Sequence, residues 1–205
     1  MSTGDLAGIA GLGAFHGINP AMGWLFAVAL ALQDRSRPAL VRALPPLAIG
    51  HALSVGLMVA VLVGLEATVS ATTVRIAGAA ALAVFAIWKL VRQKHPRWVG
   101  FRVTPTELVL WSFLMASAHG AGLMLLPFLS GSSAATNQFA GLHAGLAPAA
   151  LAVAVHTVAM ITVAGIVAVA VYETVGVGIL RSAWINVDRL WAGALLIGAG
   201  ATLLA

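Results

Sequence analysis

Long runs of apolar residues, separated by short polar and basic stretches, dominate this chain. Six runs carry few or no charges: residues 6–32, 43–65, 69–90, 108–129, 147–171 and 190–205. A helix needs about 20 mostly apolar residues to cross the hydrocarbon core of a bilayer, and only the last run is short. The pattern predicts an all-α, polytopic membrane protein with six transmembrane helices and a single domain, 1–205.

The basic residues between the runs predict the orientation in the membrane. Arginines and lysines follow the first, third and fifth runs, within residues 35–42, 89–102 and 181–189, and Arg75 is the one exception among the eleven. The positive-inside rule places their side of the membrane in the cytoplasm. Both termini are therefore expected on the non-cytoplasmic side of the cell (cytoplasmic) membrane, which in a bacterium is the inner membrane.

Composition agrees with this class and excludes several others. Hydrophobic residues make up 61% and charged residues only 8%, against roughly 25% charged in a soluble domain. The net charge of +5 comes from the basic loops, so it reflects topology and predicts no nucleic-acid partner. The chain has no cysteine and hence no thiolate metal ligand. Without a nucleophile elbow, a phosphate loop or paired carboxylates, it is not expected to be an enzyme.

The two halves of the chain, about 1–92 and 104–205, repeat the same features in the same order around a basic loop, 93–103. Each half has three apolar runs, with a glutamate at the end of the second and an arginine at the start of the third. Three is an odd number, so the two halves should cross the membrane in opposite orientations. Many secondary transporters are built as such inverted repeats, with the substrate site near the midplane of the membrane.

Histidines mark corresponding positions in the two halves. His16 and His119 each begin a His-Gly step in the first run of their half. His51 and His156 lie in the second run, 35 and 37 residues later. Ionisable groups inside a membrane are costly and by default mark a site. The alternative for each histidine is a helix–helix hydrogen bond without further function.

Helix-breaking residues follow both His-Gly steps and lie within the same apolar runs. They are Gly17 and Pro20 in the first half, and Gly120, Gly122 and Pro127 in the second. Carbonyls freed at a broken helix can coordinate an ion when they line a cavity. The alternative is that these residues only allow close packing of helices.

Neutral imidazole is the commonest metal ligand in proteins and exchanges protons near neutral pH. We therefore expect the four membrane histidines and Asn19 to line one midplane site. Thioether sulfur suits Cu(I), and imidazole suits Zn, Ni or Co. Three methionines share a helix face with a histidine and are candidate soft ligands: Met58, Met115 and Met160. Methionine also fills gaps in any apolar core.

Two further histidines lie outside the predicted midplane site. His95 belongs to the basic loop and is expected to face solvent or lipid headgroups. His143 lies near the outer end of the fifth run and is expected to be interfacial.

The six-run plan and the segment GAFHGINPAMGW resemble the lysine exporter superfamily of membrane transporters. Within it, the motif is most similar to the nickel/cobalt exporters, which carry His-Gly-x-x-Pro-Gly-His in an early span. His16, Gly17 and Pro20 match that element. Ala21 and Met22 replace its final Gly-His, which removes one metal ligand that the resemblance would imply.

The same exporters carry a Ser-His-Thr-type segment in the next apolar stretch. His51 matches it by position, and His156 with Thr157 repeats it in the second half. A histidine-rich cytoplasmic loop, which those exporters have, is absent here. The resemblance thus implies a transporter fold and a histidine site, but leaves nickel or cobalt open as the substrate.

The sequence predicts a secondary transporter of a transition-metal cation of the Ni, Co, Zn or Cu class, with the metal as substrate. Three alternatives stay open: an exporter of amino acids or other organic solutes, a haem-binding electron-transfer protein, or an accessory subunit of a larger membrane complex. The expected partners are the lipid bilayer, a small cation or solute, and either further copies of the chain or other membrane subunits.

Overall fold

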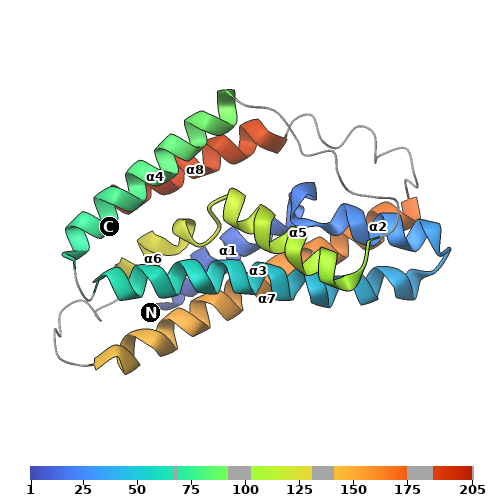
Figure 1. Ribbon diagram of the computed structural model, residues 1–205, viewed down its shortest axis with the longest axis horizontal. Helices are drawn as coiled ribbons and strands as arrows, with labels where there is room; N and C mark the ends of the chain where they lie inside the picture. The colour runs from blue at the N-terminus through green and yellow to red at the C-terminus, as the bar shows by residue number, and fades with distance from the viewer. Residues whose placement is uncertain (67–68, 92–102, 131–140, 175–186, 205) are drawn as a thin grey trace.

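The computed structural model describes residues 1–66, 69–91, 103–130, 141–174 and 187–204, and all regular structure in these ranges is helical. The predicted all-α class is therefore confirmed. In chain order the helices are α1 (Thr3–Ile18), η1 (Pro20–Met22), α2 (Trp24–Gln33), α3 (Arg37–Glu66), α4 (Ala71–Val91), α5 (Pro105–Ala118), η2 (Leu123–Leu125), α6 (Leu126–Ser130), α7 (Gly141–Thr174) and α8 (Val187–Leu204). Figure 1 shows their arrangement as an elongated bundle.

Both halves begin their first helix with the same local signal, a capping box. The Asp5 N–H donates to Ser2 Oγ (3.1 Å) and the Ser2 N–H donates to the Asp5 carboxylate (2.7 Å). Thr104 and Glu107 form the same pair at the start of α5, at 3.3 and 2.7 Å. Hydrogen bonds from the backbone and side chain of the cap residue hold the pKa of both carboxyls below their ordinary values.

The first and fourth apolar runs are each broken into shorter helices. Between α1 and α2 the chain passes through η1 and turns at Gly23, whose φ of 109° is left-handed. Between α5 and η2 it turns at Gly120, with φ of 65°, and the segments Pro105–Ala118 and Leu123–Leu129 differ in direction by 53°. Glycine adopts these angles without the clash that a Cβ would cause.

Two residues expected to break helices lie inside helices instead. Gly17 precedes the last residue of α1, and Pro127 lies in the first turn of α6. Proline is tolerated in a first turn because its missing N–H would have no intrahelical partner there. Gly122 has helical angles and begins η2, so the turn itself is made at Gly120.

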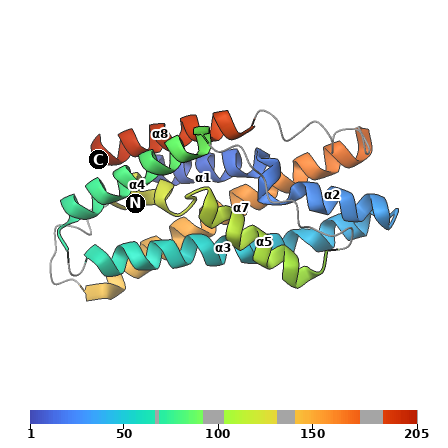
Figure 2. The ribbon, with the colours of Figure 1, turned by 45° about the horizontal axis from the view of Figure 1, so that its top comes forward.

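The helices pack in pairs that join the two halves of the chain. α1 lies along α7, α5 lies along α3, and α4 lies along α8. Helices that occupy corresponding places in the two halves run in opposite directions (Figure 1). Examples are α1 with α5 and α3 with α7. The α4–α8 pair covers one side of the bundle and packs on η2 and α6 (Figure 2).

Two helices are long and apolar enough to cross a membrane, over Arg37–Leu65 and Leu146–Thr174. The bent pair Pro105–Ala118 and Leu123–Leu129 makes a third if it counts as one span. Among the described residues, the remaining apolar runs form shorter or broken helices. The structure is thus compatible with a membrane protein, while six spans remain a prediction.

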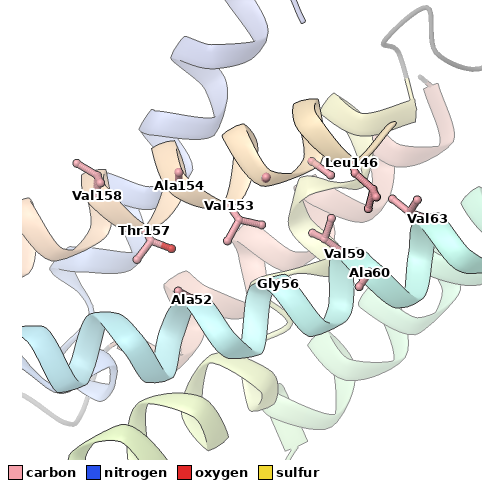
Figure 3. Close-up of a pocket in the computed structure, with 12 residues that line it drawn as sticks. Ala52, Gly56, Val59, Ala60, Val63, Leu146, Val153, Ala154, Thr157 and Val158 are labelled. Atoms are coloured by element: carbon pink, nitrogen blue, oxygen red, sulfur yellow. The ribbon is translucent and has the colours of Figure 1, made fainter. Parts of the chain in front are cut away.

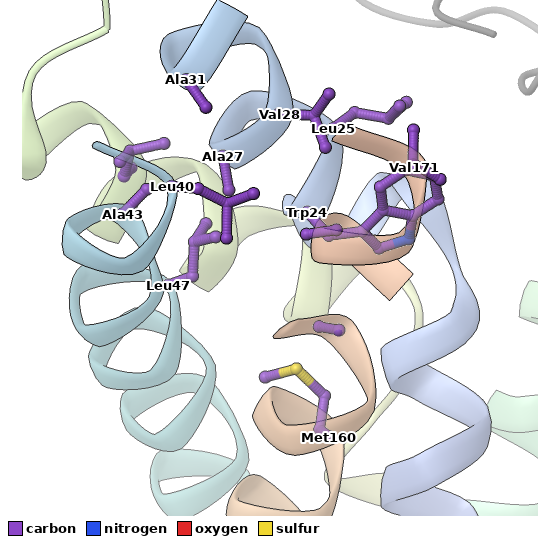
Figure 4. Close-up of a cluster of buried hydrophobic side chains, with 13 residues drawn as sticks. Trp24, Leu25, Ala27, Val28, Ala31, Leu40, Ala43, Leu47, Met160 and Val171 are labelled. Atoms are coloured by element: carbon purple, nitrogen blue, oxygen red, sulfur yellow. The ribbon is translucent and has the colours of Figure 1, made fainter. Parts of the chain in front are cut away.

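A cluster of buried apolar side chains joins α2, α3 and α7 (Figure 4). Trp24 and Leu47 lie in it together with Met160, which is fully buried. Met160 was a candidate soft ligand in the sequence, and here it packs among hydrocarbon side chains. The cluster holds α2 and the end of α7 against α3, directly beside the turn of α7 that carries His156.

Candidate functional site

Three imidazole rings from three helices meet in the centre of the bundle. The ring centroids of His16 and His156 are 4.9 Å apart, those of His51 and His156 are 5.3 Å apart, and those of His16 and His51 are 5.7 Å apart. All three side chains have no exposed surface. The structure therefore brings together three of the four membrane histidines predicted to share a site.

Glycines bring the helices that carry these histidines close together. A Cβ at Gly13 of α1 would collide with the His156 carbonyl of α7, and one at Gly17 would collide with the Met160 carbonyl. A Cβ at Gly50, next to His51 on α3, would collide with the Val109 carbonyl of α5. Small residues allow this close approach of helix backbones in membranes.

Backbone carbonyls orient two of the three rings. His16 Nδ1 lies 2.9 Å from the Leu12 carbonyl, and His156 Nδ1 lies 3.4 Å from the Ile9 carbonyl. A carbonyl can only accept, so Nδ1 carries the hydrogen in both neutral rings and Nε2 carries the lone pair. Metal-ligating histidines are typically held in this way by a bond from their other nitrogen.

His51 differs from the other two rings because no described hydrogen bond orients it. Neither of its ring nitrogens has a hydrogen-bond partner among the described residues. Its ring stacks on that of His156 with an angle of 17° between the planes. A buried polar group without a partner costs free energy, and His51 is the one ring of the three in which no described hydrogen bond compensates either nitrogen.

His119, the fourth membrane histidine, ends α5 and is buried. Its Nδ1 lies 2.6 Å from the Met115 carbonyl, the same bond to the preceding turn that His16 makes with Leu12. The two corresponding histidines thus share one local geometry, and in the described part of the chain the ring contacts with His51 and His156 are made by His16.

Asn19 is buried at the break in the first run. Its Oδ1 accepts the Ala21 N–H at 3.0 Å and so caps η1, while its Nδ2 has no partner in the described part of the chain. Asn19 is therefore held in place by its own cap and keeps a free amide donor at the end of the helix that carries His16.

Two tryptophans donate indole hydrogen bonds to backbone carbonyls at the break in the first apolar run. Trp24 Nε1–H donates to the Ile18 carbonyl (3.0 Å), and Trp111 Nε1–H donates to the Ala21 carbonyl (3.2 Å). Trp111 also packs edge-on against Phe26, with centroids 5.0 Å apart. The sequence suggested that carbonyls freed at this break could coordinate an ion. Instead, Trp111 of the second half caps the break in the first.

Several polar contacts near the site had no distinct signal in the sequence. Ser54 of α3 and Ser117 of α5 share a hydrogen bond of 2.8 Å, and Ser112 donates to the Leu47 carbonyl at 2.7 Å. Thr157, next to His156, is buried with no partner for its hydroxyl in the described ranges. Serine and threonine are common in membrane helices, so only the packing of α3 against α5 shows which of them pair.

The remaining candidates lie away from the three rings or outside the described residues. Met58 packs beside Leu62 in a small apolar cluster, and Met115 contributes its carbonyl to His119. His143 belongs to α7, but its side chain lies outside the described part, as does the whole loop that contains His95.

Within the described ranges, no three His, Cys, Asp or Glu side chains are arranged to hold a metal ion as they stand. The three rings touch by faces and edges and do not aim three nitrogens at one point. Binding an ion would therefore require rotation of side chains, most simply that of His51, which no hydrogen bond holds.

Comparison of the chain with protein-family models, with curated proteins and with solved structures finds no match. The functional argument therefore depends on the residues and on their geometry.

Proposed function

We propose that this protein is a secondary membrane transporter that moves a transition-metal cation through the cluster of His16, His51 and His156. The observation that carries the proposal is the meeting of three buried imidazoles from three helices. Imidazole nitrogens bind zinc at about 2.0–2.1 Å, so the centres of rings around one ion lie roughly 5 Å apart. The observed spacing of 4.9–5.7 Å is of that size.

The hydrogen bonds of the rings support a metal substrate. Held by the carbonyls of Leu12 and Ile9, His16 and His156 present Nε2 lone pairs, and His51 can rotate to supply a third. Among the described residues no carboxylate accompanies the three rings, so a divalent ion there would be an uncompensated charge in a buried site, and that cost weakens its binding. Weak binding is what a transporter needs to release its cargo.

The contact between the rings favours a small ion over larger ligands. Rings that touch edge-to-face or face-to-face leave no space between them for a porphyrin or for the carboxylate and amine of an amino acid. The His51 and His156 planes are nearly parallel but only 5.3 Å apart at their centroids. Haem or an organic solute would need the helices themselves to separate.

The proposal includes six membrane spans arranged as two inverted halves. In this plan the broken set α1, η1 and α2 corresponds to α5, η2 and α6, and both sets begin with a capping box. The packing of α1 on α7 then corresponds to that of α5 on α3. Opposite directions of corresponding helices support the inversion (Figure 1).

Two grooves between α3 and α7, one nearer each end of the pair, support the same symmetry. One is lined by parts of 52–63 and 146–158, the other by parts of 40–48 and 161–173. The shift along the chain that takes His51 to His156 also takes Gly56 and Ala60 of the first groove to Ile161 and Gly165 of the second. An inverted repeat would generate such a pair, one groove in each leaflet.

A metal titration of the purified protein tests the proposal. Wild type should bind Zn²⁺, Ni²⁺, Co²⁺ or Cu⁺ with a defined stoichiometry in calorimetry. His51→Gln/His156→Gln should bind none of them, because two of three ligands are gone. His95→Gln, which removes a loop histidine, is the matched control and should bind like wild type. Equal stoichiometry in all three proteins would refute the metal site.

Transport is tested in proteoliposomes that enclose a metal-sensitive dye. Wild type should change the dye signal faster than the double histidine variant, at equal amounts of inserted protein. An absorption spectrum of the same preparation addresses the haem alternative, since a Soret band would contradict the proposal directly.

A further inference from the structure

The second half of α3 presents a regular ridge and furrow to the membrane. A small residue followed by a large one recurs every four positions: Ala52-Leu53, Gly56-Leu57, Ala60-Val61 and Gly64-Leu65. The large members are 44–58% exposed. A Cβ at Gly56 or at Gly64 would meet no atom within 4 Å. Residues four apart stack along one face of a helix, so the small ones form a furrow beside a ridge of large ones.

The furrow opens into a groove of about 520 Å³ between α3 and α7. Figure 3 shows Ala52, Gly56 and Ala60 of α3 on one side of it and Ala154 of α7 on the other. All its walls are apolar except at one residue, Thr157.

Thr157 is 8% exposed, and its hydroxyl has no hydrogen-bond partner in the described ranges. Figure 3 shows this side chain on the groove side of α7, facing α3. An acyl chain offers no acceptor to a hydroxyl, whereas a backbone carbonyl of another helix does. An unsatisfied hydroxyl in hydrocarbon is costly, so the occupant of the groove should be protein.

We propose that a second copy of this chain occupies the groove, so that the protein is a dimer built on α3. A furrow and a ridge side by side on one helix are complementary to themselves about a two-fold axis along the membrane normal, because the ridge of each copy enters the furrow of the other. Small residues spaced by four are typical of close helix pairs in membranes, where polar side chains add hydrogen bonds.

The size of this face suits a stable dimer. Its large exposed side chains are Leu53, Leu57, Val61, Leu65, Leu146 and Val158, at 44–61% exposure. With the small residues between them they offer on the order of 700 Å² per copy, close to the roughly 800 Å² per partner of a stable interface. The inference needs only membrane insertion, so it holds or fails independently of transport.

The test counts subunits in lipid bilayers, by single-molecule photobleaching of the labelled full chain at high dilution. Wild type should be dimeric, and Gly56→Leu/Gly64→Leu should be monomeric because its side chains fill the furrow. Both positions face open space, so the variant should fold. Gly193→Leu/Gly200→Leu is the matched control, since these α8 glycines also face open space, and it should stay dimeric.

Two further variants examine the geometry of the contact. Thr157→Val should raise the dimer dissociation constant about tenfold to a thousandfold, because the two-fold axis makes the substitution remove two interhelical hydrogen bonds. The chain has no cysteine, so Ala60→Cys should form a disulfide-linked dimer on mild oxidation, and Gly200→Cys should not. Monomeric wild type, whether lipid or an unrelated protein fills the groove, would overturn the proposal. So would an unchanged dimer in Gly56→Leu/Gly64→Leu.

Discussion

Substituting alanine for Gly13 is the most direct probe of how the histidine cluster is assembled. The added Cβ would collide with the His156 carbonyl, which is backbone and cannot rotate away. α1 must therefore move away from α7, and His16 must move away from His156. Overpacking of this kind costs about 1–3 kcal/mol.

Alanine also gains helix propensity over glycine, by about 1 kcal/mol, and this gain has to be removed from the comparison. Gly11→Ala is the control: Gly11 lies on the same helix and faces open space, so this variant has the same gain in helix propensity without the collision. The difference in unfolding free energy between the two variants isolates the collision. Gly13→Ala should be less stable than Gly11→Ala by about 1–3 kcal/mol.

The assay is reversible unfolding in mixed detergent micelles, followed by circular dichroism. Metal affinity is measured on the same samples, and it should fall for Gly13→Ala and stay unchanged for Gly11→Ala. Equal stabilities of the two variants would show that α1 and α7 are not in the close contact described. That result would also contradict the histidine cluster, because the contact between α1 and α7 brings His16 next to His156.

Three other predictions concern contacts that join the two halves or start a helix. In a double-mutant cycle, Ser54→Ala and Ser117→Ala should show a coupling of about 0.6 kcal/mol, and at most roughly 1.7 kcal/mol, measured by unfolding; additive effects would contradict their hydrogen bond. Trp111→Phe keeps a ring against Phe26 but loses the N–H bond to the Ala21 carbonyl, so unfolding should become easier by about 1 kcal/mol; an unchanged stability would contradict that bond. The pKa of Glu107 is lowered by its bonds from Thr104, so its stabilising effect is present above pH 4.5 and is lost as pH falls through the lower, folded-state pKa. The stability difference between wild type and Glu107→Gln should therefore shrink in acid, and a difference independent of pH would argue against the capping box.

The two broken apolar runs show how precisely the local sequence pattern can locate a helix break. Gly17 and Pro127 were expected to interrupt helices but lie within them, whereas Gly120, also expected to break a helix, does make a turn with positive φ, and the other turn lies at Gly23. Glycine and proline signal that a break is near, but its position depends on which residue can adopt a left-handed angle without losing packing. Gly17 instead serves the contact with α7, and nothing in its own segment distinguishes the two roles.

The sequence by itself determined the helical class, the membrane-like composition and the histidines worth testing. Apolar runs of membrane length, basic loops and capping boxes are local signals, and local energetics decides them. Only the tertiary structure decided that His16, His51 and His156 touch while His119 ends α5, and that Trp111 caps a break in the other half. Those contacts depend on how each helix is rotated and how closely it approaches its neighbours. That is settled by glycines meeting carbonyls on distant segments, such as Gly13 at the His156 carbonyl and Gly50 at the Val109 carbonyl, which no stretch of sequence records alone.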